Sequence, residues 1–207
     1  MGSTSLVGQS MAAMLGPGSV SVLAYGSKIT ALILGVGSIA ISTAVLPHFS
    51  RMVARAEWDS VRHTLMTYAR LIVVITLPVM FILIYFSEPL VRVLFQRGAF
   101  TEADTVLVAW VQGLFLLQIP VYVLGMLLVR LISALQANRI LMWGAGINLL
   151  FNIVCNYFLM KWLGVGGLAL STSLMYLVST GFLLIMALRL MNGTSKNACS
   201  YVNTPCA

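Results

Sequence analysis

Residues 106–129 read VLVAWVQGLFLLQIPVYVLGMLLV, a stretch without a charged side chain. Because an α-helix rises 1.5 Å per residue, this stretch is long enough to cross a hydrocarbon core of about 30 Å. Other stretches of similar length and character are Val20–Leu46, Leu65–Phe86, Ile140–Met160 and Val165–Leu188. The sequence therefore predicts five membrane spans, with most of the charge in the short gaps between them.

The overall composition excludes a soluble globular fold. Of the 207 residues, 60% are hydrophobic and 8% are charged, which leaves too little polar surface to cover a globule in water. Transmembrane β-strands are about 10 residues long and alternate in polarity, and no part of the chain alternates in this way. The prediction is an all-α fold: a polytopic transmembrane helical bundle of about five full spans plus a partial N-terminal helix.

The two ends of the chain differ from the spans. Leu6–Leu15 is apolar but too short to cross a membrane, and Gly16-Pro17-Gly18 stops a helix. We therefore interpret residues 1–19 as the end of a truncated transmembrane helix with its turn, and residues 20–191 as a five-span membrane domain. Residues 192–207 are polar and without pattern, and we expect a disordered cytoplasmic tail there.

Basic residues fall unevenly between the spans and predict the topology. An excess of Lys and Arg marks the cytoplasmic side. That side carries Arg51, Arg55, Arg62, Arg130, Arg139, Arg189 and Lys196, with few acidic residues. The opposite side carries Arg92, Arg97 and Lys161, balanced by Glu88, Glu102 and Asp104. The net charge of +7 fits attraction to anionic membrane lipids. Its spread over separate loops argues against nucleic acid as a partner.

Proline and capping residues predict where helices bend or end. We expect Pro47 to close the first span. Pro78 and Pro120 lie far from the ends of their spans and should bend them. Glu88–Gln96 has apolar residues between charges and is typical of an interfacial half-helix. Thr101, followed by acidic residues, should cap the next helix.

Lys28 is a charged residue well inside an apolar run. An ammonium group within the membrane needs a partner or a water-filled cavity. One interpretation is a cationic cavity wall that binds an anionic substrate. The other is a side chain that extends toward the outer headgroups. The residues alone leave both open.

A polar stripe follows the fourth span. Asn148, Asn152 and Asn156 repeat every four residues and therefore share one helix face, and Thr172 lies near the start of the fifth span. Carboxamide and hydroxyl oxygens can bind a small cation such as Na⁺. Asn and Thr also form ordinary hydrogen bonds between membrane helices, and this second interpretation is favoured.

No catalytic constellation is evident in the sequence. His48 and His63 lie apart, with neither metal-ligand spacing nor a paired nucleophile. The glycine-rich turn Gly164–Gly167 has no phosphate-binding lysine. The sequence thus favours a protein that is not an enzyme.

Three segments together resemble a known family. Tyr25–Arg51, YGSKITALILGVGSIAISTAVLPHFSR, is similar to a segment of the MurJ/MviN lipid II flippases that has a tyrosine, a basic residue and then L-P-x-[FL]-S. Glu88–Thr105, EPLVRVLFQRGAFTEADT, resembles that family's E-P-[IV]-V-x-[LV]-[LI]-F-x-R-G-x-F. Gly164–Ser173, GVGGLALSTS, is a third similar segment after an Asn-rich helix. All three come in the family's order and spacing.

The resemblance implies a fold and a function. The family has fourteen transmembrane helices in two lobes and belongs to the multidrug/oligosaccharidyl-lipid/polysaccharide exporter superfamily. This chain looks like the end of its seventh helix through its twelfth. The implied activity is alternating-access transport of the lipid-linked peptidoglycan precursor across the bacterial inner (cytoplasmic) membrane. The implied partners are that precursor, membrane lipids and the missing N-terminal lobe.

The resemblance also implies functions for particular residues. Lys28 falls where the family usually has a cavity arginine that meets the substrate diphosphate. Asn152, Asn156 and Thr172 fall where some members have a sodium site. The aspartate of that site is replaced here by Gly8, so the remaining neutral ligands should bind sodium weakly. No other cofactor is implied.

The chain resembles part of the family's sequence, so we expect a fragment that does not flip lipid alone. Two alternatives remain open at this point. One is a membrane scaffold or remnant that packs against other helices without carrying substrate. The other is a related exporter of polysaccharide lipids or drugs.

Overall fold

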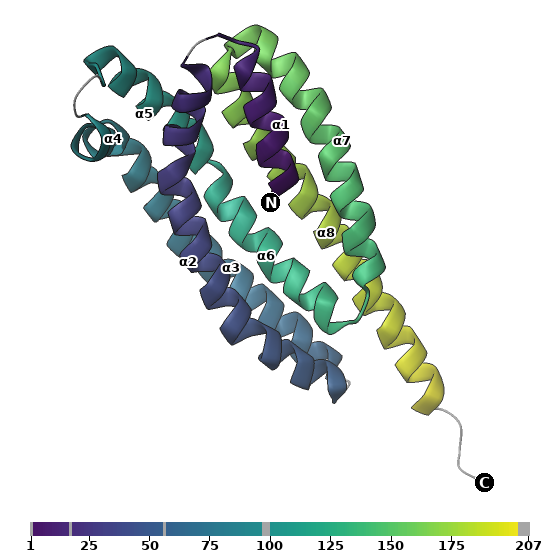
Figure 1. The fold of residues 1–207 in the computed structure, drawn as a ribbon. Helices are drawn as coiled ribbons and strands as arrows, with labels where there is room; N and C mark the ends of the chain where they lie inside the picture. Colours follow the sequence, from purple (N-terminus) through teal and green to yellow (C-terminus); the bar gives the residue numbers. More distant parts are fainter. Residues whose placement is uncertain (1, 17, 56, 97–99, 203–207) are drawn as a thin grey trace.

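The fold was analysed in a computed structural model, which describes residues 2–16, 18–55, 57–96 and 100–202, and the side chains of residues 7–191 within those ranges. The described residues form helices joined by short turns, without a strand (Figure 1). The helices are α1 (Gly2–Ala13), α2 (Ser19–Ala54), α3 (Trp58–Tyr85), α4 (Ser87–Phe95), α5 (Glu102–Leu116), α6 (Gln118–Ala134), α7 (Asn138–Leu163) and α8 (Val165–Val202).

The predicted all-α membrane bundle is confirmed. The described chain contains 5 segments long and apolar enough to cross a membrane, namely α2, α3, α5 and α6 together, α7, and the Val165–Met191 part of α8. These segments contain the five predicted spans, except that Phe86, the last residue of the second span, follows the end of α3. Helix α1 has 12 residues, which at 1.5 Å each is too short for a full crossing. The partial N-terminal helix is therefore present as expected.

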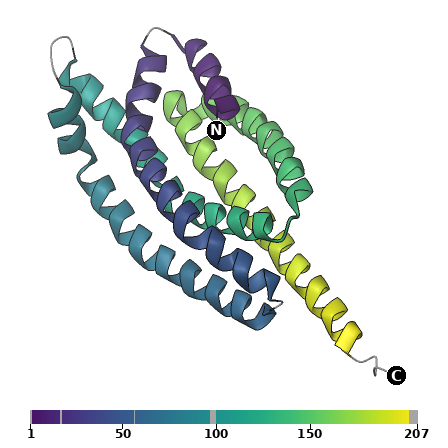
Figure 2. The ribbon, with the colours of Figure 1, turned by 60° about the horizontal axis from the view of Figure 1, so that its bottom comes forward.

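The α5–α6 pair lies at the centre of the bundle. Half of its most apolar stretch is buried, compared with 6% of the corresponding stretch of α3. Figure 1 shows α6 between the α2–α3 pair and the α7–α8 pair. The view in Figure 2 shows the same two pairs along opposite sides. The outer helices consequently expose long apolar faces, as helices in contact with lipid do.

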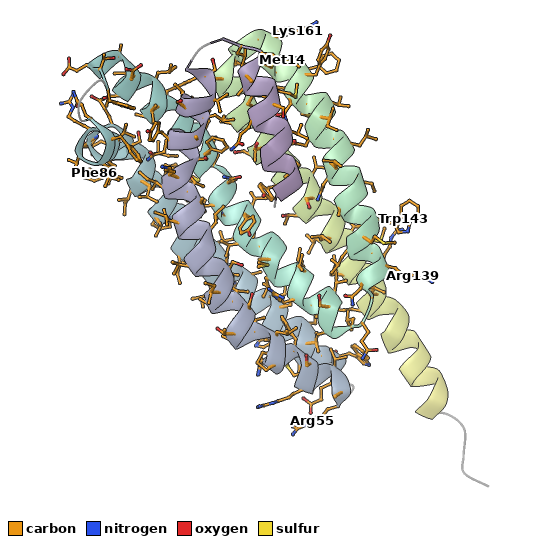
Figure 3. All side chains as sticks on the ribbon, viewed as in Figure 1. Met14, Arg55, Phe86, Arg139, Trp143 and Lys161 are labelled. Atoms are coloured by element: carbon orange, nitrogen blue, oxygen red, sulfur yellow. The ribbon has the colours of Figure 1, made fainter. Side chains whose placement is uncertain are left out.

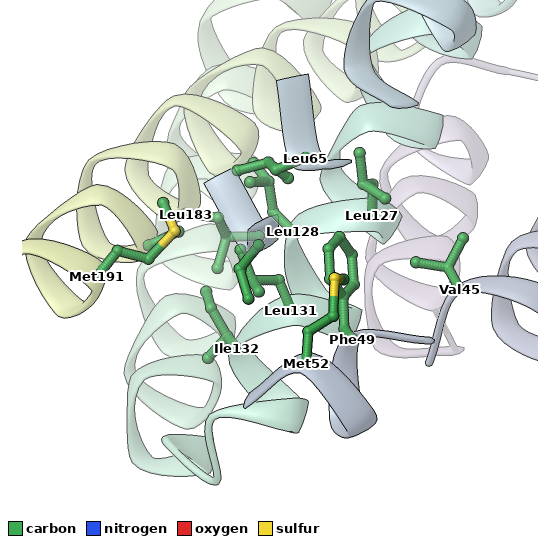
Figure 4. Packing of buried hydrophobic residues seen from close by; sticks show 12 residues of the cluster. Val45, Phe49, Met52, Leu65, Leu127, Leu128, Leu131, Ile132, Leu183 and Met191 are labelled. Atoms are coloured by element: carbon green, nitrogen blue, oxygen red, sulfur yellow. The ribbon is translucent and has the colours of Figure 1, made fainter. Parts of the chain in front are cut away.

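The largest buried cluster connects the central helix with its neighbours (Figure 4). Four side chains of α6 meet side chains of α2, α3 and α8 there. In lipid, packing rather than the hydrophobic effect holds helices together. The contributors from α2 are Val45, Phe49 and Met52, those from α6 are Leu127, Leu128, Leu131 and Ile132, and those from α8 are Leu183, Ala187 and Met191.

The connecting turns segregate to two ends of the bundle, as the charge pattern requires. In Figure 3, Arg55 and Arg139 lie toward one end, whereas Met14, Phe86 and Lys161 lie toward the other. The basic end is the predicted cytoplasmic side, and the opposite end is the predicted outer side. The alternation of turns thus agrees with spans that cross in alternating directions.

Two prolines behave differently from one another. The hydrogen-bonded helix is interrupted at Leu117, between α5 and α6. This is the expected effect of Pro120, which has no N–H to donate to the Leu116 carbonyl. The prediction that Pro47 closes the first span is wrong, because α2 continues through it to Ala54. Buried contacts of Phe49 and Met52 with α6 stabilise the helix beyond the proline.

The outer hairpin of α4 and α5 follows its local sequence signals. Helix α4 occupies nearly the whole of the predicted half-helix Glu88–Gln96. Thr101 caps α5: its hydroxyl accepts from the Asp104 backbone N–H at 3.2 Å, and the Asp104 carboxylate accepts from the Thr101 N–H at 3.0 Å. This reciprocal pair satisfies two backbone donors at the helix start.

The C-terminal segment differs from the expected disordered tail. Helix α8 passes Asn192 and runs to Val202. The segment has no proline before Pro205, so nothing in its backbone chemistry forces the helix to stop at Asn192.

The packing of α2 against α5 yields a testable prediction. A Cβ atom at Gly26 would lie 2.9 Å from Val111 Cγ1 and 3.4 Å from the Gln112 backbone nitrogen. Val111 is fully buried and has little room to move. Gly26→Ala should therefore lower the free energy of unfolding by about 1–3 kcal/mol, measured by SDS titration in mixed micelles.

Gly35→Ala on the same helix is the matched control, since its Cβ would meet nothing within 4 Å. It should leave stability unchanged or raise it slightly, because Ala favours helix. Equal effects of both substitutions would contradict the close approach at Gly26.

Candidate functional site

A cavity of about 560 Å³ opens between α1, α2, the α5–α6 pair and α8. It lies where the break at Leu117 separates α5 from α6. Gly8 and Gln9 border it from α1, and Phe115 borders it from α5. The cavity is of a size that takes a small molecule or a headgroup.

Small side chains on α2 leave the space for this cavity. Ala24, Ala31 and Gly35 line it together with Ser27 and Ser38. They recur every three or four residues, so they share one face of the helix. None of them extends far enough to fill the gap between α2 and α8.

The opposite wall presents polar atoms. The Tyr122 side chain hydrogen-bonds to Ser38 across the cavity, and its ring packs edge-on against Tyr176 with centroids 5.1 Å apart. Gln118 also lines the cavity, and its Oε1 is buried without a hydrogen-bond partner among the described residues. A buried acceptor of this kind is suited to a donor supplied by water or a ligand.

These polar wall residues were not predicted from the sequence as site residues. Gln118 looked like a packing residue inside a long apolar run. Its position two residues before Pro120 could have indicated a site. A proline interrupts the helix in the preceding turn, and a polar side chain at such an interruption can face a cavity. Tyr122 and Tyr176 carried no such signal.

Lys28 lies beside the cavity rather than in its wall. It is exposed on α2, and its Nζ lies 5.0 Å from the centroid of the Tyr25 ring. The cavity residues Ala24 and Ala31 flank it on the same helix face. Because helical side chains point toward the helix N-terminus, the ammonium extends toward the outer end of α2.

The asparagine stripe faces α8. Asn148 Nδ2 donates to Ser179 Oγ at 2.7 Å, Asn156 Nδ2 donates to Asn152 Oδ1 at 3.1 Å, and the Ser171 hydroxyl donates to Asn156 Oδ1. Asn152 and Asn156 are each 1% exposed. The contacts with Ser179 and Ser171 connect α7 with α8, as interhelical hydrogen bonds in membranes do, and the Asn156–Asn152 contact lies within α7.

The predicted sodium ligands are close in the fold but differently directed. Thr172 and Gly8 line the cavity, whereas Asn152 and Asn156 do not. Both carboxamide oxygens already accept a hydrogen bond, and the described residues contain no group of three or more His, Cys, Asp or Glu side chains that could hold a metal. The donor set fits helix–helix bonding better than a cation. Sodium binding stays a prediction.

Arg130 forms a second polar connection near the basic end. Its Nη2 donates to Ser42 Oγ at 2.5 Å and so connects α6 with α2. Its Nε is buried without a partner in the described part of the chain. An arginine at the inner end of a span is often a lipid-headgroup anchor. The contact with Ser42 gives it a position between two helices.

Comparison with known proteins identifies relatives along nearly the whole chain. A family model described as "Lipid II flippase MurJ" matches residues 3–204. A "Probable lipid II flippase MurJ" from Rhizobium meliloti (strain 1021) is 32% identical over 152 residues, which is 73% of this chain and 28% of that protein. A protein of the same name from Vibrio cholerae is 30% identical over 171 residues, 79% of this chain and 31% of that protein.

The fold is also similar to a solved structure, titled "Lipid II flippase MurJ, inward closed conformation". The TM-score is 0.78 at 23% identity, and the match covers 99% of this chain and 45% of that chain. This likeness concerns the arrangement of helices. The present chain spans about a third of the length of the curated relatives it matches.

The buried hydrogen bonds of α7 predict a graded loss of stability. Asn156→Leu would leave the Ser171 hydroxyl without its Asn156 acceptor and Asn152 Oδ1 without its donor, both in buried surroundings. The expected loss is about 1–3 kcal/mol in the free energy of unfolding, measured by SDS titration. Asn148→Leu breaks a half-buried contact and should cost less.

Thermal unfolding in a neutral detergent and a sodium-free buffer examines the sodium prediction, because dodecyl sulfate is added as its sodium salt. If the asparagines act as helix connectors, replacing sodium by choline should leave the wild-type midpoint unchanged. A rise of the midpoint with sodium that Asn156→Leu abolishes would instead support a cation site at these residues.

Proposed function

The chain belongs to the MurJ family of lipid II flippases, and from this premise we propose that it forms one lobe of a transporter for a lipid-linked peptidoglycan precursor. It is a multi-pass protein of the bacterial cytoplasmic membrane, with helices suited to cross the bilayer. In the proposed mechanism the lobe moves against a second lobe, so that a central site opens to each leaflet in turn.

The observation that carries the proposal is a polar hollow beside a cationic side chain in an otherwise apolar bundle. Cavity residues from α2, α6 and α8 include hydroxyl and carboxamide groups, although the surrounding helices are apolar. Polar groups inside a membrane protein are costly and mark pathways for substrates or ions. Pure packing against lipid would require neither the hollow nor the charge.

Lys28 is the proposed contact for the substrate diphosphate. Among the described residues the ion pairs are Arg55–Glu57, Arg92–Glu88 and Arg92–Glu102, so no carboxylate there neutralises Lys28. An unpaired ammonium next to a cavity attracts an anion. Its charge is compact and has three donors, so it binds phosphate without the bidentate geometry of arginine.

The remaining helices of the flippase are the proposed partner. The small side chains of α2 line the cavity without filling it, and Leu32, Val36 and Ile39 on α2 are 67–72% exposed. The chain also spans about a third of its relatives' length. We therefore expect transport to need a second lobe, and we expect no catalytic step, because the lobe rearranges no covalent bonds.

Binding of a polyprenyl diphosphate tests the proposal directly. The full chain is reconstituted in nanodiscs, and its dissociation constant for undecaprenyl diphosphate is measured by microscale thermophoresis. Lys28→Ala should weaken binding at least tenfold, about 1.4 kcal/mol, whereas Lys28→Arg should retain it. Lys161→Ala is the matched control, since Lys161 also lies over a tyrosine ring, 4.6 Å from the Tyr157 centroid, but is not among the cavity residues.

Growth of a flippase-depleted bacterium tests the need for a second lobe. The chain alone should not restore growth, and the chain expressed together with the remaining helices of a flippase should. Unaltered binding by Lys28→Ala would remove the substrate contact and favour a scaffold that carries no substrate. Rescue by the chain alone would refute the two-lobe requirement.

A further inference from the structure

We propose that Tyr25 is a positioning residue for Lys28, and that the outer hairpin α4–α5 fixes the Tyr25 ring for this purpose. The inference rests on the proposed role of Lys28 in binding a diphosphate. It assigns a task to a hairpin that lies outside the cavity. Three side chains from three parts of the chain form the aromatic contact: Tyr25, Phe95 and Phe100.

The Tyr25 ring is clamped by two aromatic neighbours. Its centroid lies 5.0 Å from that of Phe95, with the planes tilted by 57°, and 5.8 Å from that of Phe100, at 85°. Both separations fall within the range of favourable aromatic pairs. Phe95 ends α4 and Phe100 precedes the start of α5, so both ends of the connection between these helices meet the ring.

A small buried core supports this clamp. Val91 of α4 and Val108 and Ala109 of α5 are buried against one another, and Tyr25, Phe95 and Phe100 pack around them. Val91 and Val108 are each 0% exposed. The Tyr25 ring is thereby attached to the hairpin as well as to its own helix, which restricts its rotation.

The clamped ring in turn holds the ammonium. Lys28 Nζ lies 5.0 Å from the Tyr25 centroid, within the 6 Å limit of a cation–π contact. The two residues are three apart on α2 and so lie on neighbouring parts of one helix face. The ring shields one side of the ammonium, while the exposed remainder of Lys28 can meet an anion at the same time.

The acidic groups of the hairpin do not compete for Lys28. Glu88 lies 3.3 Å from Arg92 and Glu102 lies 3.7 Å from the same guanidinium. The Asp104 carboxylate accepts from the backbone and the hydroxyl of Thr101. Each of these carboxylates has a partner within the hairpin, so the hairpin contributes aromatic surface to Lys28 and leaves its charge for an external anion.

Holding a flexible lysine near its bound position lowers the entropic cost of binding. Exposed cation–π contacts correspond to about a two- to fivefold change in an equilibrium constant. Tyr25→Leu should therefore weaken the affinity for undecaprenyl diphosphate by about this factor. Tyr25→Phe keeps the ring and should keep the affinity.

Two measurements test the positioning role on the full chain in nanodiscs. First, the lysines are dimethylated with ¹³C-formaldehyde, which keeps their charge, and the Lys28 signal is assigned with Lys28→Arg. Its ring-current shift should persist in Tyr25→Phe, decrease in Phe100→Leu and disappear in Tyr25→Leu. The Lys161 signal should stay constant and shows that each variant is folded. Second, the dissociation constant for undecaprenyl diphosphate is measured for the same unmethylated variants.

The outcomes separate this inference from the proposed function. An unchanged Lys28 shift in Tyr25→Leu would overturn the positioning role whatever the affinity. A lost shift with unchanged or tighter binding would show that the ring does not prepare Lys28 for an anion, and would also overturn it. If Lys28→Ala binds as well as wild type, the proposed substrate contact fails, while the shift still reports whether Tyr25 holds the lysine.

Discussion

Attachment of α2 and α8 to the central α5–α6 pair is the interaction on which the rest of the bundle depends. Ser173 and Thr180 of α8 donate to the backbone carbonyls of Leu114 and Val121 at 2.8 and 2.9 Å. A Cβ at Gly125 would lie 2.7 Å from Thr180 Oγ1, so the two helices meet without an intervening side chain. In lipid such close approaches and hydrogen bonds replace the hydrophobic effect, and they fix both walls of the cavity.

The same fold divides its polar residues between two tasks. On α7 the asparagines turn toward α8 and satisfy one another, which stabilises the pair and leaves little for a ligand. Around the cavity, by contrast, Gln118 keeps an unpaired acceptor and small α2 side chains leave space. Polar groups that already have hydrogen-bond partners hold helices together, whereas an unpaired polar group beside a cavity can bind a ligand.

Much of the fold could be predicted because its signals are local. Span length, turn residues and the Thr101 cap each depend on a few neighbouring residues, and the structure confirms them. The predicted end of the helix at Pro47 was wrong, because contacts of Phe49 and Met52 with α6 stabilise the helix beyond the proline. The cavity wall could not be predicted, since it depends on which faces of distant helices meet. The charge of Lys28 and its position within an apolar run are evident from the sequence. The aromatic rings that hold Tyr25 beside it come from Phe95 and Phe100, about 70 residues further along the chain, and this contact could not be predicted.

The length of α2 couples the protein to the thickness of its bilayer. Its 36 residues extend roughly 54 Å, well beyond a hydrocarbon core of about 30 Å. With Arg51 taken to lie at the predicted cytoplasmic surface, Lys28 lies roughly 35 Å away along the helix axis. In a thin bilayer with the helix nearly upright, this distance places the ammonium close to the level of the outer phosphates. A thicker bilayer, or a strongly tilted helix, leaves the ammonium among acyl chains, where an unpaired charge is most costly. Lipid composition therefore affects how strongly Lys28 favours binding of an anion.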